Sequence, residues 1–141
     1  MATTKYGKYI VKEPFKKGRN EEVIEPMVHL NGEKDGGGAD LTVSRSWITQ
    51  PFRMIKEPHK HDRDQFLIFM GGNPMNVRDF GAEVELFLGE EGERHIIDGP
   101  AIVHIPAGLM HGPLEYKRID KPIVFLDIYL APTYVRKEKS D

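Results

Sequence analysis

From Leu41 onward the chain consists of short apolar and β-branched runs separated by turn residues, and this pattern limits it to β folds. The runs cover residues 41–49, 52–57, 65–70, 82–89, 94–98, 101–105, 114–119 and 123–130. Helical periodicity is weak throughout, and Pro26 interrupts the best helical candidate, near residues 20–30. About seven or eight strands at a spacing of roughly 8–12 residues favour an all-β sandwich or barrel.

The two ends of the chain differ from this repeating centre. Residues 1–40 are polar and are expected to form an extended N-terminal arm packed on the barrel, ending in a glycine-rich turn at residues 36–38. Residues 41–131 are expected to form the barrel, and residues 132–141 a solvated tail. No secretory signal is visible at the N-terminus, and no apolar run approaches the roughly 18 residues of a membrane span. A cytoplasmic protein without a membrane partner is therefore predicted.

Composition excludes several kinds of chemistry. The 141 residues include six His and no Cys, so disulfides, thiolate nucleophiles and Cys-based zinc sites are excluded. The formal charge of −2 argues against a nucleic-acid partner. The glycine run at residues 36–38 lacks a following Lys-Ser/Thr pair and is not a phosphate-binding loop.

Two short segments place histidines where they can converge. His59 and His61 are two residues apart, so in a strand both imidazoles point to one face. Gln65 has the same parity and brings an amide to that face if the intervening turn allows it. His111 ends a second segment, in which Pro106 and Gly108 form a tight turn. Two imidazoles from one strand and a third from a distant hairpin suit Zn²⁺, Fe²⁺, Mn²⁺ or Ni²⁺ with positions left open.

These two segments resemble the paired motifs of the cupins. The first cupin motif is G-x5-H-x-H-x(3,4)-E-x6-G, and His59, His61 and Gly72 match it, with Gln65 in the place of Glu. The second motif is G-x5-P-x-G-x2-H-x3-N, and Pro106, Gly108 and His111 match it. The sequence departs from the two motifs at Arg53, Gly99 and Glu115. The resemblance covers about residues 41–131.

The resemblance implies a double-stranded β-helix, or jelly-roll, barrel that binds one divalent metal ion per chain. The implied ligands are His59, His61, His111 and the residue at position 65, and the metal would be Fe, Mn, Ni or Zn. Since Gln65 carries no charge, three imidazoles and an amide would leave the full +2 on the ion, which would then be a stronger Lewis acid but held more weakly. An anionic small-molecule substrate would supply the missing charge. A homodimer is also implied.

The sequence leaves three functions open. The first is a metal-dependent isomerase, lyase or decarboxylase acting on a small oxygenated substrate. The second is an iron-dependent dioxygenase, and the third is a non-catalytic cupin that binds a small ligand or metal. Candidate catalytic residues are Glu85, which lines the barrel only if its face of the strand points inward, and Tyr129. If Val84 and Leu86 point inward instead, Glu85 is solvated.

The remaining polar residues have structural alternatives. His29 and His95 are expected to be solvated, and His104 to be packed or hydrogen-bonded. Asp127 shares a face with Tyr129 and could reach the rim of the cavity. Arg45 and Arg53 could bind an anionic substrate if they point inward, although the sequence leaves their direction open.

Overall fold

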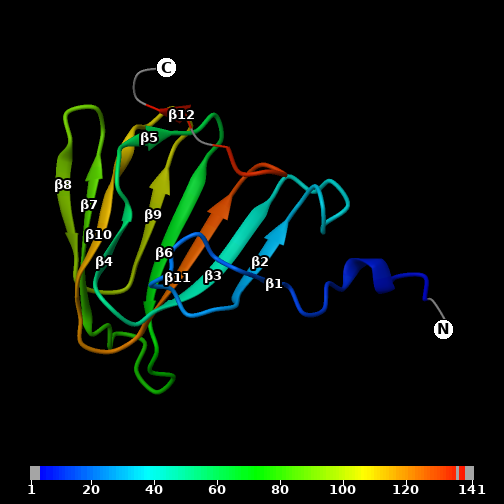
Figure 1. Ribbon diagram of the computed structural model, residues 1–141, viewed down its shortest axis with the longest axis horizontal. Helices are drawn as coiled ribbons and strands as arrows, with labels where there is room; N and C mark the ends of the chain where they lie inside the picture. The colour runs from blue at the N-terminus through cyan, green and yellow to red at the C-terminus, as the bar shows by residue number, and fades with distance from the viewer. Residues whose placement is uncertain (1–3, 136, 139–141) are drawn as a thin grey trace.

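The computed structural model describes residues 4–135 and 137–138, and it confirms the all-β class predicted from the sequence. Two antiparallel sheets face each other and enclose the hydrophobic core (Figure 1). Within the described residues the only helical segment is one 3-10 turn, η1 (Gly7–Tyr9). No helix in this part of the chain has the length and apolar content needed to cross a bilayer.

The two sheets are named here A and B. Sheet A contains, in spatial order, β1 (Phe15–Lys16), β2 (Met27–Asn31), β3 (Thr42–Ile48), β11 (Ile123–Tyr129), β6 (Gln65–Gly71) and β9 (Ala101–Ile105). Sheet B contains β12 (Lys137–Glu138), β5 (His59–Lys60), β10 (His111–Ile119), β7 (Ala82–Leu88) and β8 (Glu93–Ile97), with β4 (Phe52–Ile55) also paired to β10. Strands distant in sequence are thus neighbours, as in a jelly roll.

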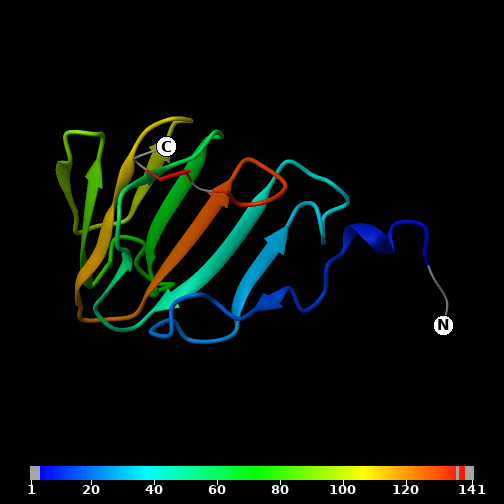
Figure 2. The same ribbon diagram turned by 45° about the horizontal axis from the view of Figure 1, so that its top comes forward.

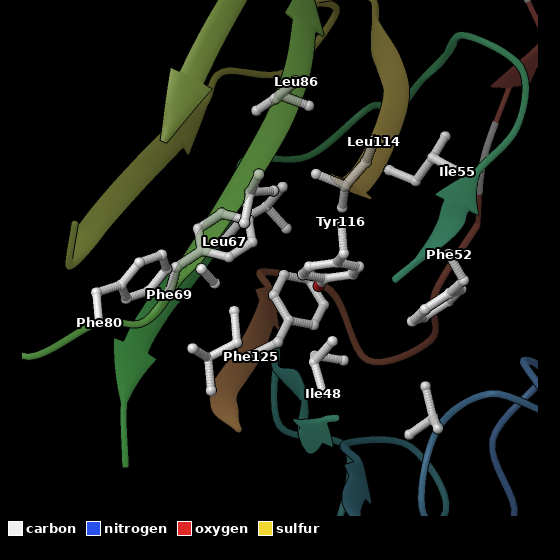
Figure 3. Close-up of a cluster of buried hydrophobic side chains, with 14 of the residues drawn as sticks. Ile48, Phe52, Ile55, Leu67, Phe69, Phe80, Leu86, Leu114, Tyr116 and Phe125 are labelled. Atoms are coloured by element: carbon white, nitrogen blue, oxygen red, sulfur yellow. The ribbon is translucent and has the colours of Figure 1, made fainter. Parts of the chain in front are cut away.

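The core follows from the alternation of side chains along each strand. Leu67 and Phe69 of β6 point inward with Phe125 of β11, and they meet Leu114 and Tyr116 of β10 (Figure 3). The Phe69 and Phe125 ring centroids lie 5.2 Å apart, an ordinary distance for an aromatic pair. Burial raises the pKa of the Tyr116 phenol well above its usual value, so this hydroxyl stays protonated inside the core.

The N-terminal arm joins the barrel through only part of its length. β1 and β2 extend sheet A, and Val23 between them is buried in the core. Residues 4–13 are exposed, and they project away from the sheets beyond the β1–β2 edge (Figure 2). The region near residues 20–30, the best helical candidate, contains β2 instead of a helix.

Stability measurements can test which face of β7 points to the core. Leu86→Ala removes a fully buried side chain and should lower the free energy of unfolding by about 2–5 kcal/mol. Glu83→Ala, on the opposite face of the same strand, removes only a surface ion pair with Arg118 and should change it by less than about 1 kcal/mol. Urea denaturation measures both values. If both variants lost the same free energy of unfolding, the assignment of the inner and outer faces of β7 would be wrong.

Candidate metal centre

Strand pairing in sheet B brings two of the motif histidines together. His59 begins β5 and His111 begins β10, and the two residues are direct partners in the antiparallel pairing of these strands. His111 is also paired with Leu88 of β7. The register of two neighbouring strand pairs therefore determines the position of the His111 backbone.

The three motif histidines form one buried cluster. The ring centroids of His59 and His111 lie 4.4 Å apart, those of His59 and His61 4.9 Å, and those of His61 and His111 5.1 Å. The three residues are at most 2% exposed. One nitrogen from each ring can be chosen so that the three atoms lie within 4.8 Å of one another. This arrangement fits three ligands of one metal ion.

Backbone hydrogen bonds join the two loops that carry the histidines. The Gly108 N–H donates to the carbonyl of His61 at 2.8 Å, and Gly108 has a φ of +86°, a conformation that favours glycine. The Ala107 N–H donates to Asp64 Oδ1 at 2.9 Å, and His104 Nε2 lies 2.8 Å from Asp64 Oδ2. These bonds lower the pKa of the Asp64 carboxyl, with the His104 contact the larger cause. His104 is thus hydrogen-bonded, one of the two outcomes expected for it.

Two backbone carbonyls orient the imidazoles. His61 Nδ1 is hydrogen-bonded to the carbonyl of Val135, and His111 Nδ1 lies 3.0 Å from the carbonyl of Leu109. A carbonyl only accepts, so in the neutral rings the proton sits on Nδ1 and Nε2 carries the lone pair. Ligating histidines in proteins commonly have this arrangement, with the second nitrogen donating to a carbonyl.

Gln65 is buried on β6 with a defined amide orientation. Its Nε2 donates to Asp127 Oδ1 at 2.7 Å, and because a carboxylate can only accept, the amide nitrogen must face Asp127. Gln65 Oε1 is also buried, and no described residue donates a hydrogen bond to it. Gln65 is paired across the sheet with Tyr129, whose ring contacts His61 at 4.9 Å. A buried acceptor of this kind fits an oxygen ligand for a cation.

Two tyrosines lie against the histidine cluster. Tyr129, expected from the sequence, is buried and donates to the Val135 carbonyl at 3.3 Å. Burial and, to a smaller extent, the Asp62 carboxylate raise the pKa of the Tyr129 phenol. Tyr134, which sequence analysis missed, has its ring 4.8 Å from the His61 ring and its hydroxyl oxygen 3.5 Å from His59 Nε2.

The position of Tyr134 corrects the expectation for the C-terminal tail. Residues 132–141 were expected to be solvated, but Tyr134 is half-buried and β12 pairs with β5 beside His59. Residues 136 and 139–141 lie outside the described residues. The only sequence signal for this packing is the aromatic ring itself, in an otherwise charged segment.

A cavity of about 510 Å³ lies inside the barrel next to this cluster. Gln65, Asp127, Tyr129 and Tyr134 are among the residues that line it. The N-terminal arm and the turn after β2 line it with cations, namely Lys16, Lys17, Arg19 and Lys34. His29 also lines the cavity, and burial together with the Lys16 ammonium lowers its pKa. His29 is therefore half-buried and faces the cavity rather than being solvated.

Three other candidates point away from the interior. Val84 and Leu86 occupy the core, so Glu85 lies on the outer face of β7, where its Oε2 is 2.6 Å from Arg94 Nε. The structure therefore does not bring Glu85 to the histidines. Arg53 forms an outer ion pair with Glu115 at 2.9 Å. Arg45 is exposed, with its guanidinium 6.0 Å from the ring centroid of Trp47.

Comparison with known proteins gives matches in structure only. No family model and no curated protein matches the sequence. Bacillus subtilis oxalate decarboxylase, a protein with Mn(II) centres, matches 86% of the chain with a TM-score of 0.55 at 12% identity. Lactobacillus farciminis oxalate decarboxylase, solved as a formate complex, matches 89% with a TM-score of 0.58 at 13% identity. An oxalate oxidase matches 88% with a TM-score of 0.56 at 13% identity.

These proteins are longer than the chain. It spans 29% of the Bacillus subtilis decarboxylase, 33% of the Lactobacillus farciminis decarboxylase and 58% of the oxalate oxidase. At 12–13% identity the likeness is one of fold.

Proposed function

We propose that this chain, which has the fold of the cupin barrels, is an enzyme that uses one divalent metal ion to act on a small anionic substrate. The ligands in this proposal are His59, His61, His111 and Gln65 Oε1. The observation that carries the proposal is the buried cluster in which three imidazole nitrogens lie within 4.8 Å of one another. A bound ion of this kind polarises a carbonyl or carboxylate oxygen of the substrate.

The identity of the donor atoms narrows the choice of metal. The proposed ligands are nitrogen and oxygen, which suit Fe, Mn, Ni and Zn, and a chain without Cys offers no thiolate. The Mn(II) centres of the structurally similar Bacillus subtilis decarboxylase support Mn among these candidates.

The Asp127 carboxylate carries a negative charge, but in this proposal the side chain of Gln65 lies between it and the ion. Asp127 accepts the amide hydrogen of Gln65 at 2.7 Å, which directs Oε1 away from the carboxylate. Asp127 is therefore a positioning residue, and the direct oxygen ligand is neutral. A neutral ligand set leaves more of the metal charge to be balanced by an anionic substrate.

The walls of the cavity support the same substrate class. Lys16, Lys17, Arg19 and Lys34 line the cavity, and Asp127 is the only carboxylate among the described residues that line it. Cationic groups around a partly enclosed cavity attract anions and orient them by hydrogen bonding. A cavity of about 510 Å³ holds a small hydroxy acid, keto acid or sugar derivative.

Tyr129 and Tyr134 are the proposed proton donors. The Tyr129 phenol is protonated at neutral pH, as an ordinary phenol is, so it has a proton to give; burial raises its pKa, which makes the phenolate a rare species there. Tyr134 lies at the boundary between the histidines and the cavity, close to Arg19. Glu85 has no part in this proposal because its carboxylate is bound to Arg94 on the outer face. Proton transfer beside a polarised oxygen is the chemistry of isomerases, lyases and decarboxylases.

Metal content tests the proposed ligands. Protein prepared without added metal or a His tag should contain about one divalent ion per chain by elemental analysis. His59→Ala and His111→Ala should each lose most of it, because a protein-bound metal needs all three imidazoles. His95→Ala is the matched control, since His95 is exposed and bound to Glu93, and its metal content should be unchanged. Equal metal in all four proteins would rule out this site.

The same measurement separates the proposed reaction class from its alternatives. Iron together with oxygen uptake would favour the dioxygenase predicted as an alternative from the sequence. Mn, Ni or Zn would favour Lewis-acid chemistry.

An exchange of charge between positions 65 and 127 tests whether Gln65 is a ligand. Gln65→Glu alone places two carboxylates in contact and should lower the melting temperature of the metal-free protein. The double variant Gln65→Glu/Asp127→Asn restores the hydrogen bond and puts the charge on the ligand side. It should therefore hold the ion at least about tenfold more tightly than the wild type. Competition with a chelator measures the metal affinity. Equal affinity in the wild type and the double variant would show that residue 65 does not contact the ion.

Anion binding tests the role of the arm. Oxalate, used as a small dicarboxylate probe, should bind the metal-loaded protein with an affinity that falls as ionic strength rises. Lys16→Met and Arg19→Met should each weaken this binding several-fold by calorimetry. Lys117→Met is the control, because Lys117 lies beside Glu115 on the outer face of sheet B. Binding that none of these changes affects would contradict the anionic substrate class.

A further inference from the structure

The cavity beside the histidine cluster extends along the inner face of sheet A. One row of paired polar side chains crosses four neighbouring strands, β6, β11, β3 and β2 (Figure 1). Its members, in this order, are Gln65, Tyr129, Thr42 and Asn31. All four line the cavity. At about 4.8 Å between strands, the row spans roughly 14 Å, so the polar lining continues well beyond the proposed oxygen ligand.

A second polar row lies beside the first on the same face. His29 of β2 is paired with Ser44 of β3, and Ser44 with Asp127 of β11. These three side chains also line the cavity. The Ser44 hydroxyl both donates and accepts hydrogen bonds, and the Asp127 carboxylate accepts them. This wall of the cavity therefore offers a mixture of donors and acceptors across several strands.

The His29 imidazole has a nitrogen without a partner. Its Nδ1 is buried and makes no hydrogen bond with any described residue. Burial and, to a smaller extent, the Lys16 ammonium lower its pKa, so the ring is neutral at pH 7 and has one N–H donor and one lone-pair acceptor. Buried polar atoms are normally hydrogen-bonded. A ligand hydroxyl, which both donates and accepts, can pair with either nitrogen of the ring.

The side of the cavity formed by sheet B is apolar. Among the described residues, this sheet contributes Met54 and Ile55 of β4 to the lining. A ligand between the two sheets therefore meets hydrogen-bonding groups on one side and apolar groups on the other. A carbon chain with several hydroxyl groups has both kinds of surface.

Cationic residues lie at the β2 end of the cavity. Lys16 on β1 and Lys34 in the turn after β2 line it. In the strand order, β3 and β11 separate β2 from β6, which carries Gln65. The charge of the two lysines attracts any anion, but contact requires a ligand with an anionic group far from the proposed metal ion.

The distance between the strands restricts the length of such a ligand. Ser44 lies two strands away from Gln65, which corresponds to about 10 Å. Oxalate has a single C–C bond of about 1.5 Å and is too short to contact both side chains. An extended six-carbon chain spans about 6 Å between its end carbons, and its end groups and the two side chains cover the rest. The cavity of about 510 Å³ has room for such a molecule.

We propose that His29 and Ser44 form a second binding subsite in this cavity, for a polyhydroxylated anion of about six carbons with an acidic group at each end. One acidic group lies at the proposed metal ion, the hydroxyl groups lie along the polar rows, and the second acidic group points toward Lys16 and Lys34. This inference rests on the proposed function and narrows its substrate class to sugar acids.

Six-carbon dicarboxylates test the contribution of the hydroxyl groups. Adipate and the hexarates glucarate, galactarate and mannarate have the same chain length and the same two carboxylates, and the hexarates add four hydroxyl groups. The zinc-loaded protein should bind at least one hexarate at least about tenfold more tightly than adipate by calorimetry. The reason is that a site with buried hydrogen-bonding groups rejects a ligand that leaves them unpaired. Adipate binding as tight as that of all three hexarates would overturn the proposal.

Substitutions at the subsite test whether these residues recognise the hydroxyl groups. Ser44→Ala and His29→Leu should each reduce the preference for the hexarate several-fold. Arg45→Ala is the matched control, because Arg45 is adjacent to Ser44 on β3 but is exposed on the outer face, and it should keep the wild-type preference. A preference that both Ser44→Ala and His29→Leu retain in full would come from chelation of the ion by a hydroxyl group beside the carboxylate. That result would overturn the proposed subsite.

Metal content and oxalate binding separate this inference from the proposed function. Both should be the same in Ser44→Ala and His29→Leu as in the wild type, because oxalate is too short to reach these side chains. A wild type that holds no zinc or binds no oxalate would contradict the proposed function. A wild type that holds zinc and binds oxalate, but does not prefer any hexarate to adipate, would contradict the second subsite alone.

Discussion

The antiparallel pairing of β5 with β10 is the constraint on which the candidate site depends. It places His59 directly opposite His111, although the two belong to segments far apart in the sequence. A shift of one residue would turn either imidazole to the other face of the sheet and away from the interior. The Gly108–His61 and Ala107–Asp64 hydrogen bonds hold the same two segments together at their loops. Fold and site are therefore specified by the same contacts.

Sequence patterns predicted those features that depend on local periodicity. The strands and the parity of His59 and His61 follow from alternation, which is a property of one strand. The face occupied by Glu85 could not be assigned in advance, because it depends on which side of β7 meets the core. Tyr134 was missed because its position depends on the chain returning to β5 after β11. Such long-range contacts produce no pattern in the sequence around the residues involved.

The charged side chains near the histidine cluster lie behind the proposed ligands and along the cavity, and the proposed ligands themselves are neutral. The side chains proposed as ligands are neutral, and the Asp127 carboxylate is one hydrogen bond behind Gln65. Cationic residues of the arm are among those that line the cavity. The arm is therefore part of the site as well as of the fold. Strand β6 serves two surfaces, since Gln65 and Leu67 face the interior while Phe66 and Ile68 face outward.

X-ray absorption spectroscopy of the zinc-loaded protein tests the central claim most directly, because it reports the atoms around the ion without requiring a substrate. Three imidazoles and one oxygen should give nitrogen and oxygen neighbours at about 2.0–2.1 Å. The spectrum should also show the outer-shell scattering of three histidine rings, and one ring fewer in His111→Ala. A spectrum with oxygen neighbours alone, or one that His111→Ala leaves unchanged, would contradict a metal centre at His59, His61 and His111.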